Sequence, residues 1–348
     1  MTDTGVSRRT FLRIGAATGS LTLAGCSGSD STTPTGQPTV PGGAIDSGVP
    51  TRDGRTTEDG DAAELDSERP SAVVGQRILD ESVGFLVERA GRQRQLARSG
   101  EAPSGQEFLV VLLSMKNRGD TEIQMTDLTD FRVASDGTTR ERIRLVSQTG
   151  SQFTDGLLVP GETVRGLVAF EVAAGSQGWS FVFDVDAVET DLEQVTVDLA
   201  AQPRQPASRF RQSFRVPVNE VGASVTEAGL TVTVSEVRTA DSIGGTTAGE
   251  GRVFHLPTVR VDNGKDRTAF LGLTGQLLLT GERGTPRPLS LSVQQQIDDA
   301  FPLNPNVPSG EHVEGEVPYV VAAGEGPLYL AFDFTSSGAT EKGIWRLR

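Results

Sequence analysis

The side chains most often used in catalysis and metal binding are scarce in this sequence. Its 348 residues include two histidines, His255 and His312, and one cysteine, Cys26. Zinc and copper sites of usual composition need several imidazole or thiolate ligands. The sequence therefore argues against such a metal centre, and we predict no cofactor.

A serine hydrolase would need one of the two histidines as its general base. His255 lies in a segment with strand-like alternation, and His312 lies beside a turn at Gly310. No Gly-x-Ser-x-Gly motif occurs near either histidine. We predict that both are solvent-facing strand and turn residues, and that the protein is not an enzyme.

Neighbouring carboxylates could supply oxygen ligands for calcium. Two such pairs occur, namely Asp184 with Asp186 and Asp298 with Asp299. The chain has no Asp-x-Asp-x-Asp-Gly loop, and adjacent carboxylates are expected in so acidic a sequence. The glycine-rich stretch 244–251 lacks the lysine of a phosphate-binding loop. We therefore predict no metal site, and a flexible loop between strands at 244–251.

A local group of arginines stands out in this acidic chain, whose formal net charge is −14. It consists of Arg89, Arg92, Arg94 and Arg98. These side chains could contact an anionic partner, either a carboxylate-rich protein or a surface glycan. The alternative is a solvated loop whose arginines pair with Glu88 and Glu101.

The cysteine lies at the end of a weakly apolar segment, 14–24, which is too short to span a bilayer. The sequence Leu-Ala-Gly-Cys ending at Cys26 resembles the lipobox of prokaryotic lipoproteins, in which a diacylglyceryl-type lipid alkylates the thiol. A single thiol in an exported chain also has no disulfide partner. We predict lipidation at Cys26, because two acyl chains suffice for stable anchoring.

Export is indicated by Arg8 and Arg9, which stand shortly before Phe11 and Leu12. This arrangement resembles the twin-arginine signal, whose pathway carries folded proteins. An ordinary basic N-terminus is the alternative. With the lipid, the signal predicts a position on the extracellular face of the cytoplasmic membrane.

The excess of acidic over basic residues limits the classes of partner that the protein can bind. Only three of the 32 basic residues are lysine, and 46 residues are acidic. This balance favours a salt-adapted, haloarchaeal source over a GC-rich genome with an acidic surface, because salt screens repulsion between carboxylates. Such a surface repels phosphates, so we predict no nucleic-acid binding.

Composition divides the chain into segments. The signal peptide is predicted at 1–25 and a disordered tether, rich in Gly, Ser, Thr, Pro and Asp, at 26–70. Two folded domains are predicted at 71–201 and 216–348, with a proline-bearing linker at 202–215. The oligomeric state is not indicated.

The two folded segments are repeats of one another. Phe108 precedes Asn117 by the same interval that separates Phe254 from Asn263. Three further pairs of segments correspond: Val74-Gly75 with Val221-Gly222, Gly161-Glu162 with Gly310-Glu311, and 181–184 with 330–333. Apolar residues at alternate positions predict short strands in each half. About seven strands in about 125 residues fits a β-sandwich, and a closed barrel is the alternative.

The first repeat resembles an immunoglobulin-like domain of unknown function that is common in prokaryotic lipoproteins. The resemblance rests on Asn117-Arg118-Gly119, Ser135-Asp136-Gly137 and 158–163. The second repeat departs from this pattern at Pro308-Ser309-Gly310 and in 243–251. The resemblance implies an all-β fold of two tandem immunoglobulin-like antiparallel sandwiches, related to a secreted immunoprotective antigen, without established catalytic residues.

These observations predict a membrane-tethered binding or scaffold lipoprotein that contacts an envelope protein or a glycan. A structural spacer of the envelope is one alternative. An extracellular enzyme of unrecognised type is the other.

Overall fold

The structure is a computed structural model, and it describes residues 69–96, 100–125, 130–143, 153, 156–185, 190 and 192–348. The predicted signal peptide, nearly all of the predicted tether and the residues Arg8, Arg9 and Cys26 lie outside this set. Within it, strands predominate and the two α-helices have four residues each. No helix of the described residues is both long and apolar enough to cross a membrane.

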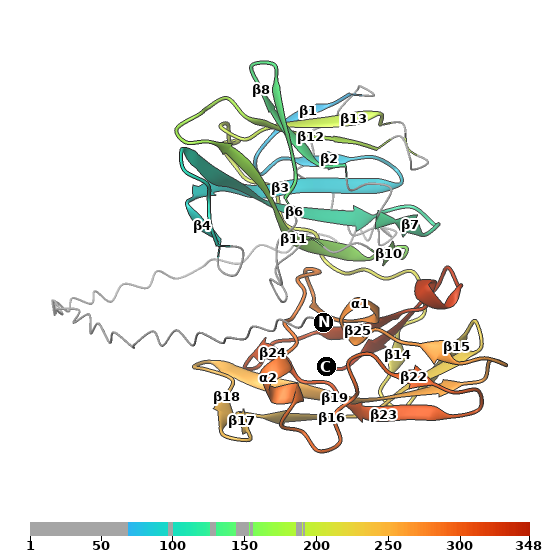
Figure 1. Cartoon of the computed structure of the whole chain (residues 1–348). Helices are drawn as coiled ribbons and strands as arrows, with labels where there is room; N and C mark the ends of the chain where they lie inside the picture. The colour runs from blue at the N-terminus through green and yellow to red at the C-terminus, as the bar shows by residue number, and fades with distance from the viewer. Residues whose placement is uncertain are drawn as a thin grey trace, which may run out of the picture. The chain divides into compact units, whose positions relative to one another are not determined.

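The first sandwich packs two sheets face to face, with the strand orders β11-β6-β3-β2 and β1-β13-β12-β8-β9 (Figure 1). Their inward side chains form one buried cluster that includes Phe85, Met115, Phe170 and Phe183. The strands are β1 (Ser71–Val73), β2 (Arg77–Leu79), β3 (Val83–Gln93), β6 (Gln106–Asn117), β8 (Arg132–Ser135), β9 (Thr138–Glu141), β11 (Thr163–Ala173), β12 (Ser180–Asp184) and β13 (Gln194–Asp198). Two small ribbons accompany them: β4 (Gln95–Leu96) with β5 (Gly100–Glu101), and β7 (Ile123–Gln124) with β10 (Leu157–Leu158).

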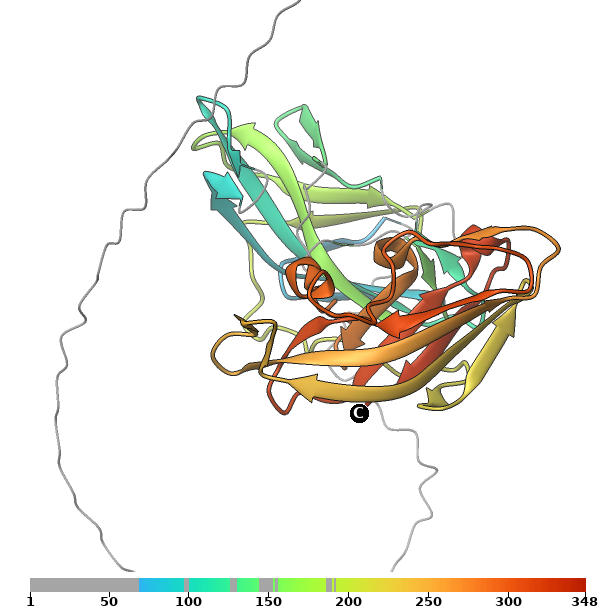
Figure 2. The same cartoon turned by 60° about the horizontal axis from the view of Figure 1, so that its bottom comes forward.

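The second sandwich has the sheets β15-β16-β19-β23, with β24 also on β19, and β14-β26-β25-β21. Figure 2 shows its long strands β16 and β19 side by side. The strands are β14 (Asn219–Glu220), β15 (Ser224–Glu227), β16 (Leu230–Ala240), β19 (Arg252–Asn263), β21 (Leu277–Gly281), β23 (His312–Glu316), β24 (Tyr319–Ala322), β25 (Leu328–Asp333) and β26 (Lys342–Arg346). The remaining elements are β17 (Ser242–Ile243), β18 (Thr246–Thr247), β20 (Ala269–Phe270), β22 (Asn306–Val307), α1 (Leu273–Gln276), α2 (Leu291–Gln294) and η2 (Thr335–Ser337).

The fold prediction is confirmed: the chain is all-β, and each repeat is a sandwich whose strands pair mainly antiparallel. In both sandwiches the first strand is an exception, because β1 pairs parallel with β13 and β14 pairs parallel with β26. The order β1-β13-β12-β8 therefore matches β14-β26-β25-β21, while β9 has no counterpart among the strands of the second sheet and β11 corresponds to both β23 and β24.

The glycines of the repeated Val-Gly pair have the same role in each sandwich. Gly75 and Gly222 have φ values of 89° and 99°, a region that favours glycine. Their N–H groups donate to the carbonyls of Val87 and Val234, at 2.8 and 2.6 Å. In each case a β-bulge follows the acceptor, between Val87 and Arg89 or between Val234 and Glu236. The bulge bends the strand at the same point in both sandwiches.

The repeated asparagines are buried hydrogen-bonding centres. The Nδ2 amide of Asn117 donates to the carbonyls of Thr121 and Leu158, at 2.7 and 2.8 Å. Asn263 makes the equivalent bonds, both at 2.8 Å, to Arg267 and Val307. Each asparagine thus joins the turn that follows its strand to the small ribbon, β7–β10 or β20–β22, and this explains the repeated spacing.

The predicted linker packs along the first sandwich. The Arg77 guanidinium donates to the carbonyl of Ser208 at 2.8 Å and lies over the ring of Phe210. Phe210 is buried against Gly84, where a Cβ would lie 2.9 Å from the ring. Further along, the N–H of Ser213 donates to the carbonyl of Gly161 at 3.0 Å. These contacts hold the segment between the two repeats in a defined path.

A buried ion pair joins the two repeats, which belong to one compact unit. The Lys342 ammonium lies 2.9 Å from the Glu162 carboxylate, and the two side chains are 7% and 3% exposed. Lys342 also donates to the carbonyl of Leu157, and Glu162 accepts the N–H of Val159 at 3.1 Å. Removing either partner would leave a charge with reduced access to water.

Candidate functional site

The predicted arginine contact surface is only partly described, because Arg98 lies outside the described residues. Arg92 pairs with Glu107 and also donates to the carbonyl of Ser176. Arg94 lies 3.6 Å from Glu101, as the solvated-loop alternative predicts. Contact of these arginines with a partner stays a prediction.

Glu88 does not pair with Arg89, Arg92 or Arg94, the described members of the group, so for these that part of the loop interpretation is wrong. Its carboxylate accepts from Arg165 at 2.7 Å and lies 3.0 Å from Arg209 of the linker. Ser114 donates to it as well. Burial acts to raise the pKa of Glu88, but the hydrogen bonds from Arg165 and Ser114 and the charges of both arginines lower it overall. Glu88 is therefore part of the packing between the first sandwich and the linker.

The histidine prediction is right for exposed His312 and wrong for His255. His255 is buried on β19, in register with the buried Tyr319 of β24. Neither of its ring nitrogens has a hydrogen-bond partner among the described residues. Burial, and to a lesser extent the charge of Arg348, lower the pKa of His255. Because neither nitrogen is hydrogen-bonded, no described hydroxyl group is placed for His255 to activate as a general base.

In the described part of the chain, no group of three or more potential metal ligands occurs. Asp184 is engaged by Arg132 and by Gln194, both at 2.7 Å. Asp186 lies outside the described residues. The glycine-rich stretch begins within a hairpin of strands β17 and β18, and its remainder leads into β19.

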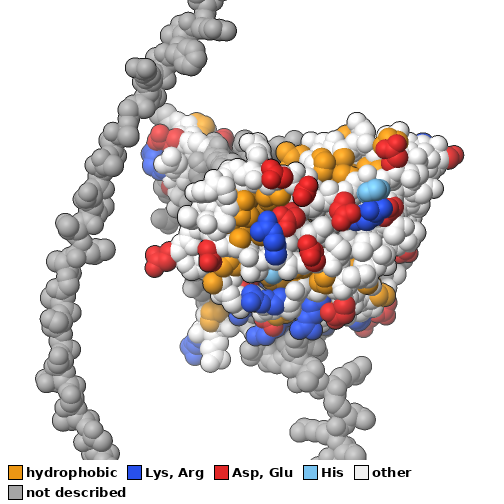
Figure 3. Space-filling model, turned by 90° about the horizontal axis from the view of Figure 1, so that it is seen from below, with side chains coloured by type: hydrophobic (Ala, Val, Ile, Leu, Met, Phe, Trp, Pro, Cys, Tyr) orange, Lys and Arg blue, Asp and Glu red, His pale blue; other side chains and the backbone are white. Residues whose placement is uncertain are grey.

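A cavity of about 660 Å³ lies on the outward face of the sheet β15-β16-β19-β23, and we call it the sheet-face cavity. Figure 3 shows acidic, basic and apolar side chains interspersed over the side of the molecule viewed from below. The cavity is lined by side chains of β16, β19 and β23, by Ile243, and by the segment that follows α2. They include Glu236, Arg238, Thr258, Glu314, Glu316, Gln296, Ile297, Asp298 and Asp299.

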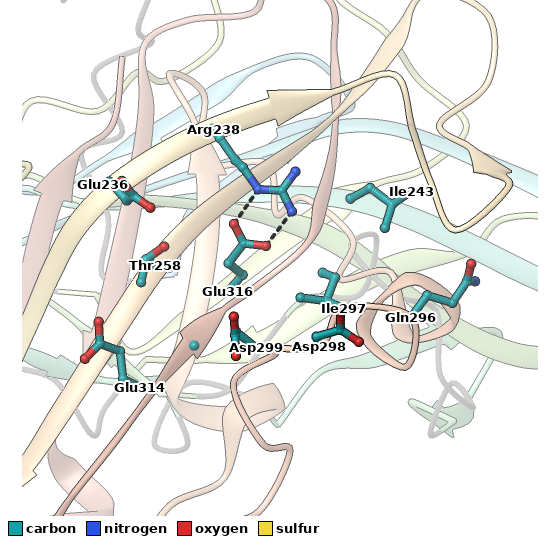
Figure 4. A pocket seen from close by; sticks show the side chains of 11 residues that line it. Glu236, Arg238, Ile243, Thr258, Gln296, Ile297, Asp298, Asp299, Glu314 and Glu316 are labelled. Atoms are coloured by element: carbon teal, nitrogen blue, oxygen red, sulfur yellow. Dashed lines mark hydrogen bonds and ion pairs between the residues drawn. The ribbon is translucent and has the colours of Figure 1, made fainter.

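Strand register sets the positions of the cavity's polar groups. Glu236, Thr258 and Glu316 are directly opposite one another on three neighbouring strands, so their side chains share one face of the sheet. The Arg238 guanidinium donates two hydrogen bonds to the Glu316 carboxylate (Figure 4). Glu236 and Glu314 lie to one side of this pair (Figure 4).

One wall of the cavity depends on Gly315. The N–H of Glu316 donates to the carbonyl of Asp299 at 2.9 Å, and the N–H of Phe301 donates to that of Glu316 at 3.0 Å. A Cβ on Gly315 would lie 2.3 Å from the backbone nitrogen of Phe301. Glycine therefore allows the segment carrying Asp298 and Asp299 to approach β23 closely.

The cavity is strongly acidic, because five carboxylates face one guanidinium. Arg238 neutralises Glu316, and Arg260, just outside, lies 3.2 Å from Glu314. A negative potential in a recess attracts cations and raises their local concentration. The arrangement can thus hold a cationic group by charge and hydrogen bonding.

The first sandwich carries different residues at the equivalent positions. Strand pairing aligns Glu314 with Arg165 and Glu316 with Leu167. There, Arg165 is bonded to Glu88 and its backbone N–H donates to the carbonyl of Gly284 at 3.1 Å. The repeated sheet face is therefore used for internal packing in one sandwich and lined with carboxylates in the other. Sequence reasoning missed this site, although the substitution of acidic residues at outward positions of the second repeat was a usable signal.

Comparison with known families supports the predicted resemblance of the first repeat to a domain of unknown function. Residues 73–191 match the family described as Domain of unknown function (DUF4352). The DUF4352 match covers the first sandwich, where the sequence carries the resemblance. No curated protein matches the chain significantly.

Solved structures with some similarity are also of low identity. The yjhA protein of Bacillus subtilis is 14% identical, with 38% of this chain and 100% of that chain covered and a TM-score of 0.30. The secreted protein MPT63 of Mycobacterium tuberculosis is 12% identical, with coverages of 37% and 97% and a TM-score of 0.29. The ycdA protein of Bacillus subtilis, described as a candidate lipoprotein, is 9% identical, with coverages of 53% and 72% and a TM-score of 0.30. At these scores, neither the DUF4352 match nor the structures transfer a function to this chain.

Proposed function

We propose that this chain is a lipid-tethered, non-enzymatic binding protein on the extracellular face of the cytoplasmic membrane, and that its sheet-face cavity holds a cationic group of an envelope protein. The observation that carries the proposal is the recess in which Glu236, Asp298 and Asp299 face solvent beside the neutralised Arg238–Glu316 pair. The tether rests on the motif at Cys26 and the arginine pair.

The cavity suits a lysine or arginine side chain better than a neutral ligand. A single exposed ion pair contributes only about 0–1 kcal/mol. Several carboxylates held on neighbouring strands act on the same cation, and the Arg238–Glu316 pair already fixes one side of the recess. Complementary charge of this kind governs the choice of partner and the association rate.

Replacing Glu236 and Glu314 by glutamine should weaken binding of a tetra-arginine peptide about tenfold, because two of the carboxylates that attract it become neutral. The affinity is measured by isothermal titration calorimetry on the full-length protein at constant salt. The matched control is Glu220→Gln with Glu250→Gln, which changes the net charge equally at exposed positions outside the cavity. Equal weakening by both pairs would show that only the overall charge attracts the peptide.

The non-enzymatic assignment has its own test. Turnover of a model ester, glycoside or peptide that a surface-loop variant abolishes would contradict it.

The anchor has a separate test. Cys26→Ser should move the protein from the membrane fraction to the medium or block its processing, because serine offers no thiol for alkylation. Fractionation with immunoblotting checks this, and Ser27→Ala, which retains the thiol, should stay in the membrane. If the processed serine variant remained in the membrane, lipid attachment at Cys26 would be excluded.

A further inference from the structure

Another cavity, of about 630 Å³, lies at one end of the second sandwich, and Gly156 of the first repeat also lines it. We call it the end-loop cavity. Its lining includes Lys265, Arg267, Thr268, Phe270, Thr335 and Ser337. None of these residues lines the sheet-face cavity, so a role for this site is independent of the proposed function.

Phe270 is an exposed aromatic side chain at the mouth of this cavity. It is 64% exposed, whereas its neighbour Ala269 on β20 is buried in the core. The first repeat shows what the fold itself requires here. Ribbon pairing aligns Ala269 with Ile123, and Phe270 with Gln124. The ribbon therefore forms without an aromatic residue, and the exposed ring of Phe270 is an addition to the framework.

The two cations at the cavity are additions of the same kind. The carbonyl of Arg267 accepts a hydrogen bond from Asn263. In the first repeat the carbonyl of Thr121 accepts the equivalent bond from Asn117, so Arg267 stands at the position of a threonine. By the same alignment, Lys265 takes the place of Gly119. The Lys265 ammonium is positioned by a hydrogen bond of 2.9 Å to the carbonyl of Ser337. The Arg267 side chain is exposed and has no ion-pair partner among the described residues.

The carboxylate of Asp333, which also lines the cavity, is already engaged. Its Oδ1 atom accepts the N–H of Thr335 at 2.8 Å, and its Oδ2 atom accepts that of Leu157 at 3.3 Å. These donors are neutral and leave the charge of Asp333 in place, so the lining carries two positive charges, on Lys265 and Arg267, and one negative charge. This is a local excess of positive charge on a protein whose formal net charge is −14.

We propose that the end-loop cavity binds an acidic saccharide. A sugar ring has a flat C–H face that can stack on Phe270, and its acid group can accept charge-assisted hydrogen bonds from Arg267 and Lys265. The hydroxyl groups of Thr268 and Ser337 can each donate and accept, as sugar hydroxyls require, and the Thr335 hydroxyl, which donates to Asp333, can accept. A volume of about 630 Å³ is within the usual range of small-ligand sites.

The lining argues against other anionic ligands. Apart from Phe270, the lining is dominated by glycine, hydroxyl and charged residues. It therefore offers no apolar pocket for the apolar side chains that a peptide ligand carries beside its acidic ones. A bare anion would use the two cations and leave the exposed ring without a role. The combination of one ring, two cations and several hydroxyls fits a saccharide with an acid group.

The test uses the full-length protein and two trisaccharides, trigalacturonate and neutral maltotriose, in calorimetric titrations. Trigalacturonate should bind, and maltotriose should bind about tenfold more weakly or not at all, because it lacks the carboxylates. Phe270→Gln and Arg267→Thr install the residues of the first repeat, so both should fold, as circular dichroism can confirm. Each should weaken trigalacturonate binding about tenfold.

Three results would overturn the proposal. These are absence of trigalacturonate binding, equal affinity for maltotriose, and unchanged affinity in the folded Phe270→Gln variant. Tighter binding of a triaspartate peptide than of trigalacturonate would replace the saccharide with a peptide. The Glu236→Gln/Glu314→Gln variant should retain trigalacturonate binding, since its substitutions lie in the other cavity.

Discussion

Replacing Lys342 by methionine is expected to lower the free energy of unfolding by about 3–5 kcal/mol, the usual cost of leaving one partner of a buried ion pair alone. Methionine retains much of the side-chain volume but leaves the Glu162 carboxylate, 3% exposed, without its cation. The carbonyl of Leu157 also loses a donor. Denaturant unfolding can be followed by fluorescence, because the two tryptophans, Trp179 and Trp345, lie one in each sandwich.

A matched exposed pair provides the control. Arg69 and Glu193 lie 2.7 Å apart, but their side chains are 71% and 51% exposed. Arg69→Met should therefore cost no more than about 1 kcal/mol. The double variant Glu162→Gln/Lys342→Met removes both charges and should recover part of the loss. A cost for Lys342→Met as small as that of Arg69→Met would mean that the ion pair does not hold the repeats together.

The fold could be predicted from the sequence because its main signals are local and repeated. Alternating apolar residues, such as Leu109, Val111 and Leu113, identify a strand with one inward face, and the structure buries all three. The equal interval from phenylalanine to asparagine in both halves identifies the repeat. Each asparagine ends its strand, and its side-chain amide bonds to one carbonyl of the following turn and one of the small ribbon, so its position is fixed by the backbone.

His255 shows where that reasoning fails. Alternation assigns it to the face opposite Phe254 and Leu256, and a polar residue between apolar neighbours is expected to face solvent. In the structure, Phe254 and Leu256 are covered on the outward face by Val293 of α2, while His255 faces the inner cluster beside Tyr319. The strand is buried on both faces at this point, and no local pattern in the sequence shows which distant element covers it.

The candidate sites could not be predicted from local sequence patterns either, because their residues are far apart in the sequence. The carboxylates Glu236 and Glu316 are 80 residues apart and meet only through the pairing of both their strands with β19. Glu88 finds its partners on β11 and on the linker, not among the nearby arginines. Once the repeats are superposed by strand pairing, positions where they differ, such as Phe270 and Gln124, separate framework residues from candidate binding residues.

Replacing Asn263 by leucine is expected to lower the free energy of unfolding of the second sandwich by about 2–4 kcal/mol, because the carbonyls of Arg267 and Val307 lose their donor in a buried site. Leucine is similar in size to asparagine, so the loss reflects hydrogen bonding more than volume. The Trp345 transition should shift to lower denaturant, with a smaller shift for Trp179.

Two further variants make this prediction specific. Asn117→Leu should give the reciprocal result, with the larger shift at Trp179, because the two asparagines hold equivalent turns. Asn219→Leu removes one bond of 3.0 Å to Ile344, in a half-buried site, and should cost only about 1 kcal/mol. If Asn263→Leu cost no more than Asn219→Leu, the asparagine would not be the centre of the repeated turn. A larger loss of stability for Asn263→Leu would also show that Asn263 supports the end-loop cavity. Its bond to the Arg267 carbonyl holds the segment that carries Arg267 and Phe270.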